Sequence, residues 1–421
     1  MATIDDEDNA ATVEPDIVIG SREQLFHLLA EAAEIEHTLM CSYLFAAFSL
    51  RDERDETFTP DQAETVGRWT KAIMGVAIQE MGHLLIVSNM ISAIGGRPHF
   101  SRPNFPVSSG YFPSGVALTL SPFSAATVRH FAFLERPTGV EMPDGEGFEA
   151  TEFERTQGTA GLMPSAQDYT TVSHLYEAIR SNLDAVSERI GEAGLFIGSK
   201  HSQLGASIFK MDKVEVITDL AAAHRAIDTI IEEGEGAPAD REQSHYQTFC
   251  VIERELDALL KAAPNFSPAY PVAENPVMRR HADLSDKVFI DAVPAALFLD
   301  LGNALYGLLL RCLVQTYAYG EETQADEKRE LMATAVDLMH GLATVAKALV
   351  RLQASPSKPA VTAGITFTML RGIEPFIAGD IERALVRERL TELSSGASSL
   401  ARYAVELAEL ASTLERRAGA F

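Results

Sequence analysis

Apolar residues recur at helical spacing along most of the chain, in long stretches separated by polar or Pro/Gly-rich segments. The pattern predicts a first helix over residues 21–50 and a second over 61–94, each with one buried face. Ser21 with Gln24 three residues later fits a capping box at the start of the first helix. A glycine pair at 95–96 is a typical end for the second helix.

The rest of the chain also reads as helical, so the predicted fold class is all-α. Residues 97–170 are rich in Pro and Gly, and we expect a long irregular crossover with one short helix after Ser124. Further helices are predicted at 171–193, 214–232 resuming at 243–262, 285–320, 327–354 and 376–418. The expected organisation is an acidic flexible tail (1–20), a helical bundle with the crossover inserted (21–262), a Pro-rich connector (263–284) and a C-terminal helical domain (285–421).

Three polar residues interrupt the apolar faces of the first two helices. Glu36 lies on the core face of the first helix, and Glu80 and His83 lie one turn apart on the core face of the second. A buried carboxylate is costly unless it is paired or binds a metal ion. Bundles with a di-iron or di-manganese centre use a Glu from each of two helices and a Glu-x-x-His pair from each of the others. The three residues match half of such a site.

The simpler reading of these residues is a set of solvated or hydrogen-bonded side chains, because short Glu-x-x-His matches are common. The combination on two adjacent helices favours metal binding instead. Carboxylates together with imidazole suit iron or manganese, whereas structural zinc sites usually contain thiolates. Tyr43 lies on the same face as Glu36 and reads either as a core tyrosine or as a neighbour of the metals. His37 points away from that face and is expected to bond to another helix.

Composition and charge limit the kinds of binding partner and the cellular compartment that we expect. The chain has 60 acidic and 35 basic residues and a net charge of −25, which argues against nucleic acid or an anionic membrane as partner. Its three cysteines are far apart in apolar contexts, as expected of reduced core residues in a cytoplasmic protein. The acidic N-terminus shows no secretory signal. The longest apolar tract is broken by Asp300 and Asn303, so it predicts a buried helix and not a membrane span.

A series of segments carries a resemblance to a known family. In chain order these are EAAEIEHTLMCSYLFAAFSL, AIQEMGHLLIVSNMISAIGGRPHF with SRPNFP, LTLSPFS, SHLYEAI, and IIEEGEG leading to SHYQTF. Over residues 21–260 the series resembles the ferritin-like domain family associated with iminophenyl-pyruvate dimer synthases of violacein biosynthesis. Weaker similarity continues to the TAGITF loop. The resemblance implies a ferritin-like four-helix bundle, a dinuclear metal site and a role in secondary metabolism.

The resemblance also assigns ligand positions. The family's acid in the first helix falls on Glu36, and its Glu-x-x-His on Glu80 and His83. In the third helix the family's ligand register falls on His174, whereas Glu177 on the same face would keep the number of carboxylates, so both stay open.

The fourth-helix segment of the family falls on Glu235 with His245 as the preferred pair, with Glu232 as the substitute. A loop separates the acid from the histidine here, so we expect a bulge to bring them together. The implied cofactor is a pair of iron ions, or manganese.

Three functions are compatible with this sequence. The preferred one is a metal-dependent oxidase or oxygenase that uses dioxygen on an amino-acid-derived or aromatic metabolite, with the crossover shaping the pocket. The second is a non-catalytic metal-binding or structural bundle, in which the C-terminal helices mediate assembly into a homo-oligomer. The third is oxidative dimerisation of the iminophenyl-pyruvate type.

Overall fold

The structure is a computed structural model that describes residues 20–52, 55–108, 111–112, 116–148, 169, 171–235, 244–370 and 373–421. The predicted all-α class is confirmed, since the described residues form eleven α-helices and only two small two-stranded sheets. The helices are α1 (Arg22–Ser49), α2 (Pro60–Ala93), α3 (Ala125–Leu134), α4 (Val172–Ile190), α5 (Glu192–Leu195), α6 (Leu220–Ile230), α7 (His245–Ala262), α8 (Val293–Ala318), α9 (Ala325–Leu349), α10 (Asp380–Leu400) and α11 (Glu406–Ala418). A π-helical turn, Ile231–Glu235, follows α6. The strands are β1 (Pro276–Val277), β2 (Val288–Phe289), β3 (Gln353–Ser355) and β4 (Lys358–Thr362).

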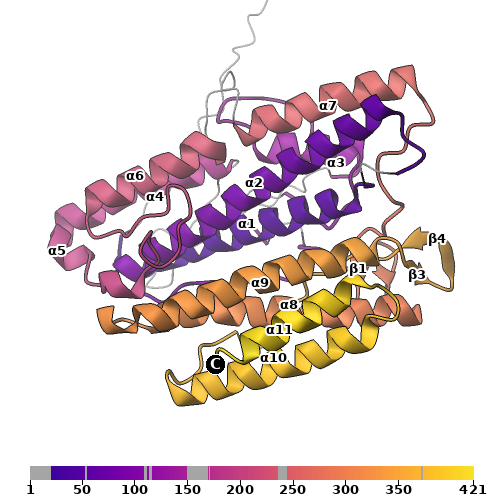
Figure 1. The fold of residues 1–421 in the computed structure, drawn as a ribbon. Helices are drawn as coiled ribbons and strands as arrows, with labels where there is room; N and C mark the ends of the chain where they lie inside the picture. The colour runs from indigo at the N-terminus through magenta and orange to yellow at the C-terminus, as the bar shows by residue number, and fades with distance from the viewer. Residues whose placement is uncertain are drawn as a thin grey trace, which may run out of the picture.

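The helices form two layers that share one core. Figure 1 shows α1 to α7 in the upper layer and α8 to α11 in the lower one. The pairs α1–α2 and α8–α9 pack most extensively in the described part of the chain. A single hydrophobic cluster runs through both layers, so α1 is covered on one side by the other upper helices and on the other by α8 and α9.

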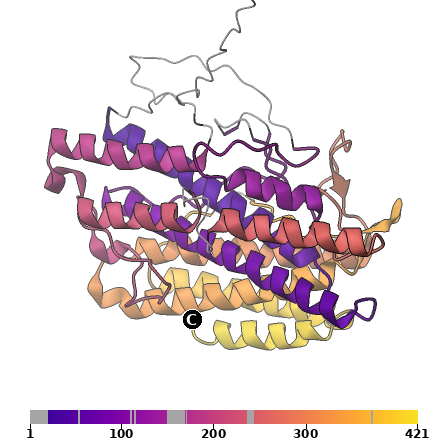
Figure 2. The same cartoon turned by 90° about the horizontal axis from the view of Figure 1, so that it is seen from above.

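The other long helices of the upper layer come in two rows, each made of two helices placed end to end with a break between them. α6 and α7 lie end to end, with the π-helical turn between them, and α4 and α3 run roughly in line in the same way (Figures 1 and 2). Each of these rows packs beside the continuous helices α1 and α2. Both interruptions therefore bring helix ends, and not helix middles, to the centre of the bundle.

The first helices agree with their prediction, with one local difference. The Ser21 hydroxyl accepts from the Gln24 N–H at 3.2 Å and caps α1. The Gln24 side chain accepts from the Gly20 N–H at 2.6 Å and from the Ser21 hydroxyl at 3.5 Å, and not from the Ser21 N–H, so the predicted capping box is displaced by one residue. The short helix after Ser124 is confirmed as α3.

Several predicted elements differ from the structure, including the helix predicted at 285–320, which begins only at Val293. The fourth helix begins at 220 and not at 214, because the Asp219 carboxylate caps the N–H of Ala222 at 2.8 Å, and Ile217 before it bonds to the Gln203 side chain. The predicted helix 376–418 is split into α10 and α11, with a turn closed by the Tyr403 N–H on the Leu400 carbonyl at 2.9 Å. The loop after α9 contains the antiparallel pair β3–β4.

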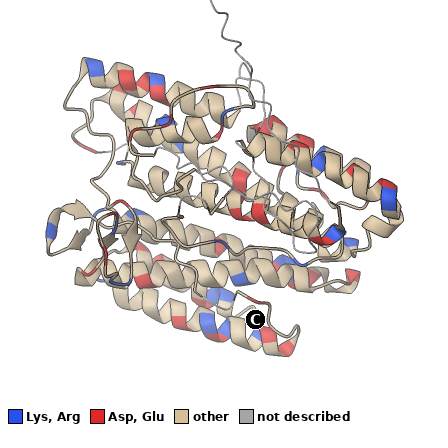
Figure 3. Ribbon diagram, turned by 180° about the vertical axis from the view of Figure 1, so that it is seen from behind, with Lys and Arg blue, Asp and Glu red and all other residues tan. Residues whose placement is uncertain are grey.

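Two helices of the described chain, α2 and α8, are long and apolar enough to cross a membrane by composition alone. Their apolar windows are 72% and 61% buried inside the fold. That burial is what core helices show, as expected for the apolar tract in α8. In Figure 3, Lys and Arg positions are scattered among acidic ones along the described helices.

Candidate metal centre

The first cluster joins α1 to α2. Glu36, Glu80 and His83 are all fully buried. His83 Nδ1 lies 3.2 Å from Glu80 Oε2 and 3.4 Å from Glu36 Oε2. These positions follow from helical geometry, because Glu80 and His83 are one turn apart on the face of α2 that packs against α1. One ligand atom of each residue lies within 4.8 Å of the others, close enough to hold one metal ion.

A second cluster uses the other oxygen of Glu80. Glu80 Oε1 lies 3.1 Å from His245 Nδ1, and Glu135 Oε2 lies 3.4 Å from the same nitrogen. His245 is the first residue of α7, and Glu135 immediately follows the last residue of α3. Both are buried, and the three residues again offer ligand atoms within 4.8 Å of one another. Glu80 thus has one oxygen in each cluster.

Several inner atoms of the two clusters lack hydrogen-bond partners. These buried atoms are Glu36 Oε2, Glu80 Oε1, Glu135 Oε2 and His245 Nδ1. His245 Nδ1 lies 3.1 Å from Glu80 Oε1 and 3.4 Å from Glu135 Oε2, but the angles do not fit a hydrogen bond. Buried polar atoms are normally satisfied, so orphaned oxygens and an imidazole nitrogen that converge call for a shared partner. A cation in each cluster would satisfy them.

Two tyrosines bind the outer oxygens of two carboxylates. Tyr176 of α4 donates to Glu36 Oε1, and Tyr43 of α1 donates to Glu135 Oε1. In both carboxylates the oxygen left without a partner is the one that faces the cluster. Each tyrosine therefore fixes which oxygen of its carboxylate is available to a metal ion.

Each of the two histidines also has a hydrogen-bond partner on the ring nitrogen that faces away from Glu80. His83 Nε2 lies 3.2 Å from Glu233 Oε2, and His245 Nε2 lies 3.1 Å from Gln79 Oε1. An acceptor on one ring nitrogen makes that nitrogen the N–H and leaves the other as the metal-facing lone pair. Both imidazoles are therefore oriented with Nδ1 toward Glu80. Glu233 in turn accepts from Lys213 Nζ at 2.7 Å.

The π-helical turn makes room for the second histidine. A Cβ atom at Gly234 would lie 2.5 Å from His245 Nδ1, so a side chain at this position would displace the imidazole. π-turns of this kind are often found at functional sites. At this turn the chain after α6 approaches the centre with a glycine, which leaves space for the imidazole of His245 from α7.

Burial and mutual charge shift the pKa values in this metal-free arrangement. Burial, and then the charges of Glu135 and Glu36, raise the pKa of Glu80 to about 8. Burial alone would lower the pKa of His245, but Glu135 and Glu80 beside it raise it to about 9. Protons thus occupy the places that metal ions would take, and metal binding must release them.

The histidine of the first cluster is protonated for the same reason. Burial disfavours its charge, but Glu233, Glu36 and Glu80 raise the pKa of His83 well above the usual value. Against the opposing effect of burial, His83 and Lys213 lower the pKa of Glu233 to about 2. The pKa of Glu36 is likewise lowered, since the effect of His83 outweighs that of burial.

The other predicted ligands lie outside these clusters. His174 is half-buried in the first turn of α4, and Glu177 is exposed; within the described chain neither belongs to a cluster. Their neighbour Tyr176 is the residue of α4 that reaches Glu36. Glu232 is exposed on the π-helical turn, and the side chain of Glu235 lies outside the described residues.

Sequence reasoning missed Glu135 and the supporting residues Gln79, Tyr176 and Glu233. Glu135 had a weak signal, because it is the acid that ends the apolar run HFAFLERP. Nothing in its spacing connects it to the other ligands. It reaches the centre only because α3 ends there.

The donor set fits the implied metals. Three buried carboxylates and two imidazoles are the hard and borderline donors that iron and manganese accept. The three cysteines are free thiols, and none belongs to either cluster. The residues therefore fit a dinuclear iron or manganese site and not a thiolate zinc site.

Comparison with known proteins adds a family and two named relatives. The Ferritin-like family model matches residues 29–254, more than half of the chain. Dichlorochromopyrrolate synthase of Lentzea aerocolonigenes is 27% identical over 414 residues, which cover 91% of this chain and 39% of that protein. The 2-imino-3-(indol-3-yl)propanoate dimerase of Chromobacterium violaceum is 27% identical over 350 residues, 77% of this chain and 32% of that protein. These matches confirm the resemblance found in the sequence.

The chain spans less than half the length of these two relatives. Among solved structures, a ferritin-like protein from Caulobacter vibrioides aligns with a TM-score of 0.49 and 18% identity, over 83% of this chain and 100% of that chain.

Proposed function

Because this chain belongs to the ferritin-like family, we propose that its two clusters hold a dinuclear iron or manganese centre that serves an oxidoreductase. The observation that carries the proposal is the place of Glu80, which has one oxygen in each of two buried ligand sets. Proteins of this type commonly use such carboxylate-bridged pairs of iron or manganese.

The residues of the chain would hold the metals as follows. Glu36 and His83 would bind one ion, Glu135 and His245 the other, and Glu80 would bridge them. Bound iron would supply one-electron redox chemistry toward dioxygen.

The surrounding side chains orient these ligands and exclude water. Tyr43 and Tyr176 hold the outer carboxylate oxygens, while Glu233 and Gln79 hold the outer histidine nitrogens. Because the metal-free centre carries protons on its histidines and on Glu80, metal loading moves those protons to solvent. Glu233 and Lys213 are the partly exposed members of this network, so they offer a route for the protons.

The substrate we propose is an aromatic, amino-acid-derived imine or 2-oxo acid. The support is the pair of relatives, whose names describe a chromopyrrolate synthase and an indolyl imine dimerase. A cavity of about 30 Å³ is lined by Leu39 of α1 and by Leu134, the residue before Glu135 at the end of α3. It has room for dioxygen or a water molecule. An aromatic substrate would need a wider approach along the crossover.

Oxidative dimerisation of such an imine is the more specific candidate, favoured by the similarity over most of this chain. A non-catalytic metal-binding bundle is the alternative, favoured by the much greater length of the relatives. Either activity fits a reducing compartment such as the cytoplasm, because Cys41, Cys250 and Cys312 are all unpaired.

Dioxygen consumption separates these alternatives. Protein loaded anaerobically with Fe(II) would be mixed with dioxygen and an aromatic imine generated from L-tryptophan by a separate amino-acid oxidase. We expect repeated dioxygen uptake above that of the oxidase, which itself consumes dioxygen to form the imine, with a coupled product if the protein dimerises the imine. Glu80→Ala is the matched control. Metal binding without any turnover would favour the non-catalytic bundle.

A further inference from the structure

A buried arginine lies between the two layers, away from the metal centre. Arg102 is only 6% exposed. Its Nη1 donates to the Pro103 carbonyl at 2.8 Å, and its Nη2 donates to the Phe367 carbonyl at 2.5 Å and to Tyr306 Oη at 3.1 Å. Its Nε has no hydrogen-bond partner. No carboxylate of the described residues forms an ion pair with this guanidinium.

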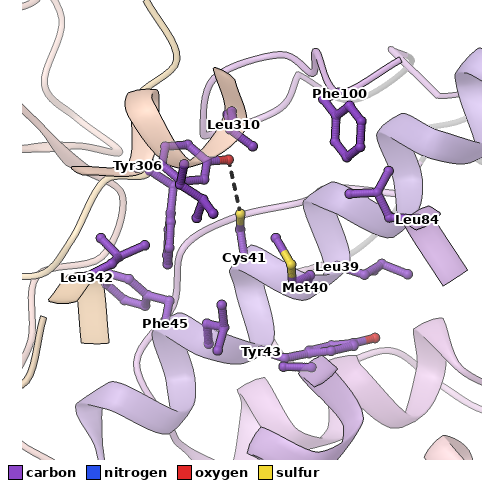
Figure 4. Packing of buried hydrophobic residues seen from close by; sticks show 14 of the residues in the cluster. Leu39, Met40, Cys41, Tyr43, Phe45, Leu84, Phe100, Tyr306, Leu310 and Leu342 are labelled. Atoms are coloured by element: carbon purple, nitrogen blue, oxygen red, sulfur yellow. Dashed lines mark hydrogen bonds between the residues drawn. The ribbon is translucent and has the colours of Figure 1, made fainter. Parts of the chain in front are cut away.

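The groups around Arg102 do not supply a negative charge. Burial raises the pKa of the Cys41 thiol and that of the Tyr306 hydroxyl, so both are neutral. Figure 4 shows the Tyr306 hydroxyl directed at Cys41, and it also lies 2.5 Å from His37 Nε2. His37, an imidazole, supplies no negative charge either. A buried cation without a counter-ion is unfavourable.

A cavity lies directly against this arginine. It has a volume of about 290 Å³ and is lined by Arg102, by the apolar side chains of Met369, Leu370 and Ile373, and by Ser101 at its exposed edge. The same three apolar residues line a neighbouring cavity of about 440 Å³ that extends along α8. Volumes of this order suit small organic ligands, and a single charged group among apolar walls sets their orientation.

We propose that this cavity binds a small organic acid, with its carboxylate on Arg102 and its apolar body against Met369, Leu370 and Ile373. Nη2 has two acceptors and Nε is buried, so Nη1, which has one partner for its two hydrogens, is the donor left for a carboxylate. The carboxylate would supply the missing counter-charge. Glu374 also lines the cavity but is exposed, so solvent weakens its repulsion of an anion.

The site is separate from the metal centre. Arg102 bonds to Tyr306, which in turn bonds to His37 of α1, whereas Glu36 of the same helix approaches His83 of α2. The proposal therefore stands whether or not the metal centre is catalytic. A purely structural role for Arg102, as a clamp between the Pro103 and Phe367 carbonyls, would account for those two bonds but not for the uncompensated charge.

Calorimetric titration of the metal-free full-length chain tests the proposal. The probes are 3-phenylpropionate and hexanoate, each paired with its neutral amide, which has nearly the same shape. We expect one acid molecule per chain, bound at least about tenfold more tightly than the amide, because a charged hydrogen-bonded pair is lost with the amide. Metal-free protein prevents the acids from binding to iron.

Two variants locate the binding. Arg102→Gln should weaken acid binding at least about tenfold and leave amide binding unchanged. Ser101→Trp keeps the arginine and its carbonyl bonds but fills the cavity, and should abolish binding of both probes. Arg51→Gln is the matched control, since Arg51 also lies over a tyrosine ring, 4.8 Å from the centre of Tyr270, but lines a different cavity.

If Arg102→Gln does not fold, the acid–amide comparison in the unmodified chain and the Ser101→Trp result decide between the two roles. Equal affinities for acid and amide, acid binding that survives Ser101→Trp, or no acid binding at millimolar concentration would each overturn the proposal.

Discussion

The two halves of the candidate metal centre are chemically alike but are built differently. Glu36, Glu80 and His83 come from the middles of two long, uninterrupted helices. Glu135 and His245 come from the ends of two shorter ones. Each half has a carboxylate held by a tyrosine and a histidine held from behind, and Glu80 belongs to both. The same ligand chemistry can thus be assembled either from helical spacing or from helix breaks.

The outer contacts of the two halves differ in charge. His83 is backed by the carboxylate of Glu233, whereas His245 is backed by the neutral amide of Gln79. A charged acceptor makes a histidine the stronger ligand. We therefore expect the half with Glu36 and His83 to fill first and to bind its metal more tightly.

Single carboxylate removals should separate the two halves most clearly. We expect Glu36→Ala and Glu135→Ala each to reduce the metal content from two ions per chain to one, because each removes a ligand of one half only. Elemental analysis after anaerobic loading measures this. Glu177→Ala, which removes an exposed acid, is the control and should retain two ions. Loss of both ions in Glu36→Ala or in Glu135→Ala would mean that the halves are not distinct.

The glycine of the π-helical turn should affect only the half built from helix ends. In Gly234→Ala the new methyl group would stand 2.5 Å from His245 Nδ1 and displace the imidazole. We expect the weaker metal to lose about 10- to 100-fold in affinity while the tighter one is unchanged. Gly75→Ala on α2, where a methyl group would meet no atom within 4 Å, is the matched control. Equal affinities in both variants would contradict the role given to the turn.

Loss of protons from the clustered residues should make the metal-free protein less stable at high pH. The folded-state pKa of His245 is about 9, above the ordinary 6.5, so its contribution is complete below pH 6.5 and is lost as the pH rises through 9. That difference corresponds to about 3 kcal/mol. Glu80, with a pKa raised to about 8, changes stability in the same direction as the pH rises from 4.5 to 8.

Denaturant unfolding at pH 6.5 and pH 9 measures this loss. Metal-loaded protein should lose less, because the ions replace the protons. A metal-free protein with the same stability at both pH values would show that the histidines are not held charged.

Removal of one tyrosine hydroxyl should have the smallest effect. Tyr43→Phe leaves Glu135 Oε1 without its donor, and Tyr176→Phe does the same for Glu36 Oε1. We expect a loss of about 1–3 kcal/mol in folding stability in each case and about tenfold weaker binding of one metal, a different one in each variant. Denaturant unfolding and metal titration check the two parts. Loss of the same metal in both variants would contradict the assignment of one tyrosine to each half.

The same contrast explains what the sequence could predict. Glu36, Glu80 and His83 could be placed together because spacing along a continuous helix fixes which side chains share a face. Glu135 could not, since its approach depends on where α3 ends and on how the crossover returns the chain. The prediction of a third-helix ligand at His174 or Glu177 placed that ligand on the helix over 171–193. In the structure that helix is α4, and it contributes Tyr176 to the centre.

The overall fold was more accessible than the centre. Helical periodicity and caps such as Ser21 and Ser124 located most helices, because these signals are local. The errors at 214–219 and at the turn after Leu400 arose where side-chain caps and packing between helices determine the ends.

An anaerobic Fe(II) titration of the unmodified chain and of Glu80→Ala tests the central claim most directly, because Glu80 is the residue that the two halves share. We predict two ions per chain, bound in two steps, for the unmodified protein and no stoichiometric binding for Glu80→Ala. A single ion per chain, or two ions that survive the loss of Glu80, would contradict a centre bridged by this carboxylate.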